Sequence, residues 1–119
     1  MKTREEILSE INHFRGTEYY YKHPLGLVKY TDGVKYLAES AECYWLIDVV
    51  ASYQVEKKFN KEKFLVFHLK VNSDLSAKIT ITDGNESILG MQMLEFTDFP
   101  LKEITLWCID RIVLLPSEY

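Results

Sequence analysis

The residues of this sequence that are best suited to chemistry are one histidine and two aspartates. His23 lies two residues after a run of three tyrosines and precedes Pro24, which restricts the backbone of the bend that carries the imidazole. A histidine oriented by a carboxylate is a minimal general acid and base. Asp32 and Asp48 are the two carboxylates that we consider as its partner. The alternative is a structural histidine that packs on the neighbouring tyrosines.

Asp48 is the single charge in the apolar second half of a predicted helix. Helical spacing places Ala41, Tyr44 and Trp45 on its face, so we expect the carboxylate to lie among aromatic rings in a dry region. Burying a lone carboxylate costs several kcal/mol or raises its pKa. Asp48 is therefore expected to be either a buried acceptor of structural hydrogen bonds or a functional proton carrier.

Other chemistries have weaker support in the sequence. Asp32 and Lys35 begin a predicted helix and offer the ingredients of an anion site, but Asp32 repels anions and acts equally well as an N-cap. Cys43 and Cys108 lie in apolar stretches without a nearby cation, so we expect both in the core. No established nucleotide, metal or hydrolase motif occurs. We therefore expect no metal site and no cofactor.

The tyrosines are concentrated in one part of the chain. Six of the eight lie between Tyr19 and Tyr44, and rings with polar tips are favoured in ligand pockets and interfaces. A purely structural aromatic cluster is the alternative. The candidate binding residues are Tyr20, Tyr21, Tyr30, Tyr44 and Trp45.

Two helices are expected to position these residues. Thr3 and Glu6 form a capping box at the start of the first helix, which we expect to end near Gly16. The second helix is expected from Val34 to about Ser52, with its later half buried nearly all round. The segment between them, residues 17–32, predicts a hairpin or two extended stretches. Residues 56–63, rich in lysine, predict a solvated connection.

The remainder of the chain alternates apolar and polar residues with the period of β-strands. Hairpin turns are expected at residues 83–85 and 110–111. Helices first and strands later predict an α+β fold. We expect a single domain over residues 1–119, in which two helices pack on an antiparallel β-meander of about five strands. Its helical part spans about 1–55 and its meander about 64–116.

The strands carry apolar residues on both faces. Phe64 and Val66 lie opposite Leu65 and Phe67, and later strands repeat the pattern. A sheet that is apolar on both faces must be covered twice, and two helices in one small domain cover only one face. We therefore expect a homo-oligomer, most simply a dimer.

Composition bounds the location and the partners. The 119 residues carry 14 basic and 18 acidic side chains, for a net charge of −4, which disfavours binding to nucleic acid or to acidic lipid. The sequence shows neither a transmembrane stretch nor a signal peptide, and two isolated cysteines fit a reducing compartment. We expect a cytoplasmic protein.

Several longer stretches of the chain, taken in order, resemble a family of small uncharacterised bacterial proteins. These stretches are His23-Pro24-Leu25, residues 30–39 (YTDGVKYLAE), residues 44–48 (YWLID), residues 97–101 (TDFPL) and residues 114–119 (LLPSEY). The family is a domain of unknown function with members in cyanobacteria, in other bacteria and in phage or mobile-element contexts. The resemblance covers nearly the whole chain and implies a single uncharacterised domain, with no catalytic residues to carry over.

Together these observations favour a small binding or interaction protein that acts as a homo-oligomer without catalysis, with a protein or small molecule as a further partner. One alternative is a small acid/base or hydrolytic enzyme that uses His23 with Asp48 or Asp32. Another is a phage or mobile-element accessory protein that engages a host protein through the acidic sheet half of the chain.

Overall fold

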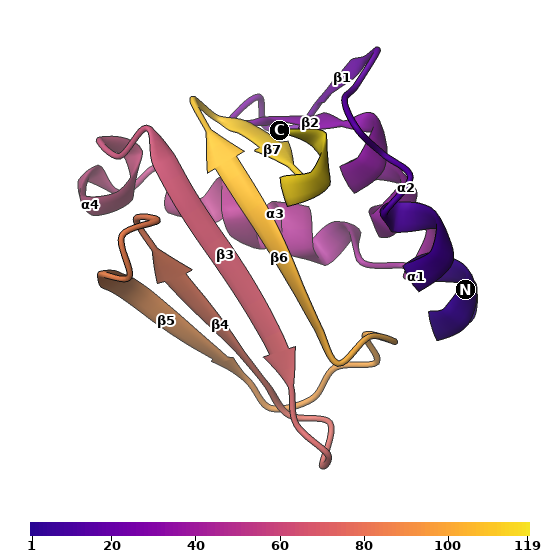
Figure 1. The fold of residues 1–119 in the computed structure, drawn as a ribbon. Coiled ribbons are helices and arrows are strands. Elements are labelled where there is room, and N and C mark those ends of the chain that lie inside the picture. Colours follow the sequence, from indigo (N-terminus) through magenta and orange to yellow (C-terminus); the bar gives the residue numbers. More distant parts are fainter.

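Seven strands form one mixed sheet in the computed structural model, which describes residues 1–119 (Figure 1). Their order across the sheet is β1 (Tyr20–Lys22), β2 (Lys29–Thr31), β7 (Ile112–Leu114), β6 (Glu103–Ile109), β3 (Phe64–Val71), β4 (Ala77–Thr82) and β5 (Ile88–Leu94). Neighbours are antiparallel except β2 and β7, which are parallel. The single α+β domain is confirmed, but the five-stranded meander is wrong.

The difference from a meander has two sources. First, β6 pairs with β3 rather than with β5, because residues 95–102 carry the chain back across the sheet and bury Phe99 and Leu101 on the way. Second, the expected early hairpin exists, and it joins the sheet through β2 and β7. The alternation of polar and apolar residues shows which face a side chain takes, but it does not show which strands are neighbours.

Four helices and one 3-10 turn accompany the sheet, where two helices were expected. They are α1 (Arg4–Ile11), α2 (Asp32–Ser40), α3 (Tyr44–Tyr53), α4 (Lys57–Asn60) and η1 (Pro116–Glu118). The Thr3–Glu6 capping box is confirmed, although α1 ends at Ile11, five residues before Gly16. The long second helix is wrong, because the chain breaks it at residues 41–43, where Glu42 has a φ of 51°.

The helices cover one face of the sheet. Figure 1 shows α3 crossing behind β3 and β6, with α2 and α1 beside it. Leu46 and Val50 of α3 belong to the same core as Phe67 and Ile79 of the strands. The opposite side of α3 faces solvent, where Tyr44 is 44% exposed, so the prediction of burial nearly all round is wrong. The apolar character of this helix reflects contact with the sheet on one face and half-buried aromatic residues at its margins.

The segment 56–63 is not merely a solvated connection. Its four lysines are exposed, but Phe59 is 4% exposed and packs edge-on against Tyr53 at a centroid distance of 4.8 Å. A Cβ on Gly90 would lie 2.8 Å from the Phe59 ring. The glycine therefore lets α4 close over this corner of the sheet.

None of these helices has both the length and the apolar character that a membrane span requires.

Candidate functional site

His23 and Asp48, one of the two pairs considered from the sequence, are in contact in the structure. His23 is buried, and its Nε2 lies 2.7 Å from Asp48 Oδ1. Its other nitrogen, Nδ1, accepts the backbone N–H of Leu25 at 3.2 Å. Because a backbone N–H only donates, Nδ1 carries no proton, and the pattern of hydrogen bonds assigns the proton to Nε2. The imidazole is neutral in this arrangement and both of its nitrogens are occupied.

This geometry favours a structural tie over acid/base chemistry. A general base needs a free lone pair within reach of a substrate, whereas the Nδ1 lone pair of His23 is already used and the ring is 4% exposed. The side chain of Asp48 is 67% exposed, so the expectation of a dry carboxylate is wrong. Asp48 lies on the solvent side of α3, and the pair joins the loop between β1 and β2 to that helix.

A first prediction concerns the strength of this tie. We expect Asp48→Ala to lower the free energy of unfolding by about 1 kcal/mol. The buried Nε2–H of His23 would lose its acceptor, and water would replace that acceptor only in part. Asp48→Asn keeps an acceptor oxygen for Nε2 and should cost less than about 0.5 kcal/mol. Urea denaturation of both variants measures the difference. Equal losses in the two variants would show that the charge, and not the hydrogen bond, stabilises the pair.

Asp32 serves a different part of the molecule. Its carboxylate accepts the backbone N–H of Glu18 at 2.9 Å and of Tyr19 at 3.4 Å, together with the hydroxyl of Tyr21 at 2.9 Å. None of these bonds involves His23, so the structure does not bring this candidate pair together. The N-cap of α2 is Thr31, and Asp32 is the first residue of the helix. Asp32 therefore fixes the segment that leads into β1.

The hydrogen bonds of Asp32 make the stability depend on pH. The Glu18 N–H, followed by the Tyr21 hydroxyl, holds the pKa of Asp32 below its ordinary value of 3.8. A carboxyl whose pKa is lower in the folded state than in the unfolded state stabilises the fold at pH values above the pKa of the unfolded state. This contribution is lost as the pH falls through the pKa of the folded state. We expect the stability advantage of the wild type over Asp32→Asn to shrink below pH 3.8, and a constant difference across that range in denaturation curves would contradict this.

Three of the candidate tyrosines form one cluster on the helical side of the sheet. Tyr21 and Tyr30 lie 5.6 Å apart between ring centroids, and Tyr44 meets Tyr30 edge-on at 6.5 Å. The ammonium of Lys35 lies 4.6 Å from the centre of the Tyr21 ring. Burial, followed by the charge of Glu39, raises the pKa of Tyr30 and of Tyr44. This cluster packs the hairpin against α2 and α3.

The other two aromatic candidates lie elsewhere. Tyr20 is 55% exposed and belongs to the opposite face of the hairpin, where it borders a groove of about 240 Å³ beside Tyr119. Trp45 lines a hollow of about 340 Å³ with Leu94 and Phe96. The five aromatic residues proposed from sequence are therefore divided among three places.

The residue that the sequence reasoning missed is Glu118. Its side chain is buried, and its oxygens accept the Thr31 hydroxyl at 2.7 Å, the Leu115 N–H at 2.9 Å and the Gly33 N–H at 3.1 Å. Two of these donors belong to the start of α2, where a negative charge is favoured by the helix dipole and the free N–H groups. Glu118 thus fastens the C-terminus of the chain to the N-terminus of α2.

Gly33 makes this contact possible. A Cβ at this position would lie 2.7 Å from the Glu118 carboxyl and 2.8 Å from Leu115. Gly33 lies in the first turn of a helix and does not have a positive φ. A glycine in such a position is the signal in the sequence that another segment packs closely against the backbone there. Two of the stretches that carried the family resemblance, residues 30–39 and 114–119, meet at this point.

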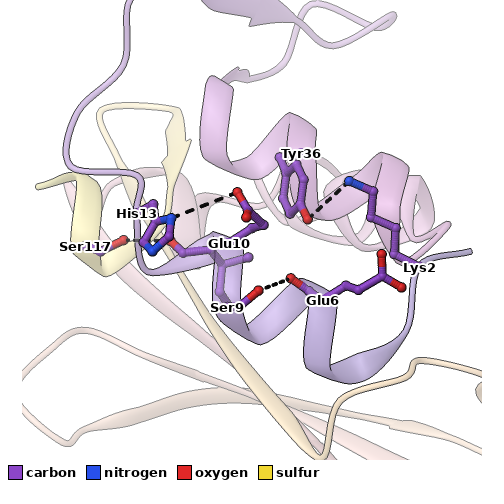
Figure 2. Close-up of polar contacts among 8 residues, drawn as sticks. Lys2, Glu6, Ser9, Glu10, His13, Tyr36 and Ser117 are labelled. Carbon is purple, nitrogen blue, oxygen red and sulfur yellow. Dashed lines mark hydrogen bonds and ion pairs between the residues drawn. The ribbon is translucent and has the colours of Figure 1, made fainter.

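The C-terminal turn also contacts α1. The Ser117 hydroxyl donates to the Ile11 carbonyl at 3.5 Å, while Lys2 reaches the Tyr36 hydroxyl of α2 at the same distance (Figure 2). His13 lies 4.0 Å from Glu10 on the surface of this region. These contacts join α1 to its neighbours and form no chemical site.

The face of the sheet that the helices leave open is ordered into rows by the strand register. Two rows are mostly apolar: Ile112, Ile109 and Phe64 form one, and Leu114, Trp107, Val66, Thr82 and Ile88 form the next. Phe64 and Trp107 are in ring contact at 5.2 Å, and Tyr119 packs edge-on against Trp107 at 5.6 Å. Apart from this C-terminal tip, no helix covers the rows (Figure 1). We refer to them as the apolar half of the open face.

The two remaining rows form the polar half of the open face. They contain Thr105, His68, Thr80 and Met91, followed by Glu103, Lys70, Lys78 and Met93. His68 lies 2.9 Å from Glu103, and this hydrogen bond is the main reason that the pKa of Glu103 is lowered. Both signs of charge therefore border the apolar half.

The thiols and carboxylates of the chain offer little else for chemistry. Burial raises the pKa of both Cys43 and Cys108 to about 12, which places both thiols outside the reactive range. The structure contains no group of three or more His, Cys, Asp or Glu side chains placed to hold a metal ion.

Comparison with known proteins gives one match. The model of a family described as "Family of unknown function (DUF6876)" matches residues 5–119. Neither the curated proteins nor the solved structures contain a match to the chain.

Proposed function

The chain belongs to the DUF6876 family of unknown function, and we propose that it acts by binding rather than by catalysis, as a homo-oligomer whose simplest form is a dimer. The observation that carries this proposal is the open face of the sheet, whose apolar half is covered only at one end, where Tyr119 packs on Trp107. Large uncovered apolar areas on folded proteins mark interaction surfaces.

The arrangement of the open face suits a second copy of the chain. Its apolar half lies beside a polar half that carries Lys70, Lys78, His68 and Glu103. Stable interfaces have an apolar centre and a polar rim, and a twofold axis through the apolar half would give both copies this pattern. Such an axis would place the charged rows at the two opposite rims of the contact.

The size of the face is compatible with such a contact. The four long strands, spaced about 4.8 Å apart and about 23 Å long, present roughly 400 Å² in projection. The shorter strands β7, β2 and β1 extend the surface toward the groove beside Tyr20. A specific interface has an accessible area of about 800 Å² per partner, so the contact must include the polar rim as well as the apolar half.

The catalytic alternative has less support. His23 and Asp48 are in contact, but the ring is buried and both nitrogens are occupied. Asp32 is committed to hydrogen bonds with residues 18–21.

The two buried, unpaired cysteines favour a reducing compartment such as the cytoplasm. Under the remaining alternative, in which a phage or mobile-element protein engages a host protein, the same face would be occupied by a different chain.

Light scattering on purified protein over a range of concentrations tests the proposal. We expect the molar mass to rise toward twice the 14.0 kDa of the chain as the concentration increases. A molar mass that stays at that of one chain would contradict the homo-oligomer. Binding of a host protein to the open face of this monomer would then support the alternative in which a different chain covers the face.

A further inference from the structure

We infer that β5 is a docking edge for an extended segment of another protein, apolar at alternate positions and flanked by lysine or arginine. This site lies at the edge of the sheet and does not depend on the proposed dimer, whose centre is on β3 and β6. A strand bound here would extend the sheet by hydrogen bonds between main chains.

The first argument is that β5 lacks the usual protection of an edge strand. Edge strands are normally short, interrupted by proline or charged, which prevents pairing with other chains. The opposite edge, β1, has three residues and includes Lys22. In contrast, β5 has seven residues without a charge or a proline, and it ends the sheet (Figure 1). Its register is regular from Gly90 to Leu94 after one shift near Ile88.

The second argument is that β5 offers apolar contacts on both sides of an added strand. Met91 and Met93 are 52% and 64% exposed on the open face. On the helical side, the hollow of about 340 Å³ lies at the end of β5 and is lined by Trp45, Leu94 and Phe96. Phe96 is 67% exposed. Side chains of an added strand alternate between the two faces, so an apolar side chain of the partner can contact this hollow.

The third argument concerns charge and decides between possible occupants. Residues 83–98 contain four acidic residues, Asp83, Glu86, Glu95 and Asp98, and no basic residue. Glu86 and Glu95 flank β5 at its two ends and both are exposed. If two copies of β5 paired in antiparallel fashion, Glu86 of one copy would approach Glu95 of the other, and like charges in such positions destabilise a pair. A segment with basic residues at both ends has the complementary pattern.

Fluorescence anisotropy with a labelled peptide tests this inference. The probe is Lys-Lys-Val-Thr-Val-Thr-Val-Lys-Lys, and its counterpart has glutamate in place of the four lysines. We expect the full-length wild-type protein to bind the lysine-flanked peptide at least about tenfold more tightly than the glutamate-flanked one. The double variant Glu86→Lys with Glu95→Lys should reverse this preference, since both side chains are exposed and the substitutions reverse the charge at each end of β5.

A second double variant separates a local effect from the overall charge. Glu5→Lys with Glu10→Lys changes the net charge by the same amount on the exposed side of α1, and we expect the preference of the wild type to persist. Hydrogen exchange should show that the peptide protects amides of residues 88–94. Equal loss of binding in both double variants, or protection confined to other strands, would overturn the inference. The inference would also be overturned if the amides of β5 became protected from exchange when only the protein concentration was raised, because a second copy of the chain would then occupy the edge. Sedimentation of the same samples reports the dimer separately.

Discussion

Replacing Glu118 by alanine is expected to lower the free energy of unfolding by about 3 kcal/mol. The carboxylate accepts from the Thr31 hydroxyl and from the N–H groups of Gly33 and Leu115, all of them in a buried region. Alanine leaves these donors without an acceptor, and an unsatisfied buried donor costs about 1–3 kcal/mol. Since a domain of this size is stable by only about 5–15 kcal/mol, the loss should be conspicuous in chemical denaturation.

Two further variants make this prediction specific. Glu118→Gln keeps one acceptor oxygen but replaces the other with an NH₂ group, which cannot accept a hydrogen bond. We therefore expect roughly half of the loss in free energy of unfolding seen for Glu118→Ala. Glu5→Ala removes an exposed carboxylate from α1 and should change the stability by less than about 0.5 kcal/mol. A loss below about 1 kcal/mol for Glu118→Ala would mean that the C-terminal turn does not fasten the fold.

The second large effect is expected from Val66→Lys. Val66 lies between Thr82 and Trp107 in the apolar half of the open face. In the monomer, a lysine there can extend its ammonium into water. In the proposed dimer the charge would be buried against an apolar surface, so we expect the dissociation constant to rise about 100-fold, equivalent to about 2.7 kcal/mol.

The control for this variant is Ser52→Lys, which adds the same charge to an exposed position on the helical side. It should leave the dissociation constant unchanged within about threefold. Circular dichroism of both variants checks that the fold is retained. An equal effect of the two substitutions would indicate repulsion between whole molecules rather than disruption of the open face.

The sequence predicted local features better than long-range ones. The capping box at Thr3, the early hairpin and the strand alternation that begins at Phe64 depend on neighbouring residues, and each is present in the structure. The position of β6 beside β3 and the parallel pairing of β2 with β7 depend on contacts between distant segments. Periodicity contains no information about those contacts.

The candidate site shows the same division. Residue types left Asp48 and Asp32 as alternative partners of His23, and only the structure shows that Asp48 is the partner and that the Leu25 N–H occupies Nδ1. Glu118 was missed because its three donors come from residues that are adjacent to it only in space, apart from Leu115. The apolar residues on both faces of the strands were predicted correctly, whereas the partner that covers the second face stays a proposal.

Sedimentation equilibrium of the wild-type protein at concentrations up to the high micromolar range tests that proposal most directly. The proposed function predicts a reversible dimer of the 14.0-kDa chain, and it predicts that Val66→Lys shifts the equilibrium toward the monomer. A wild-type protein that remains monomeric throughout this range would contradict the account.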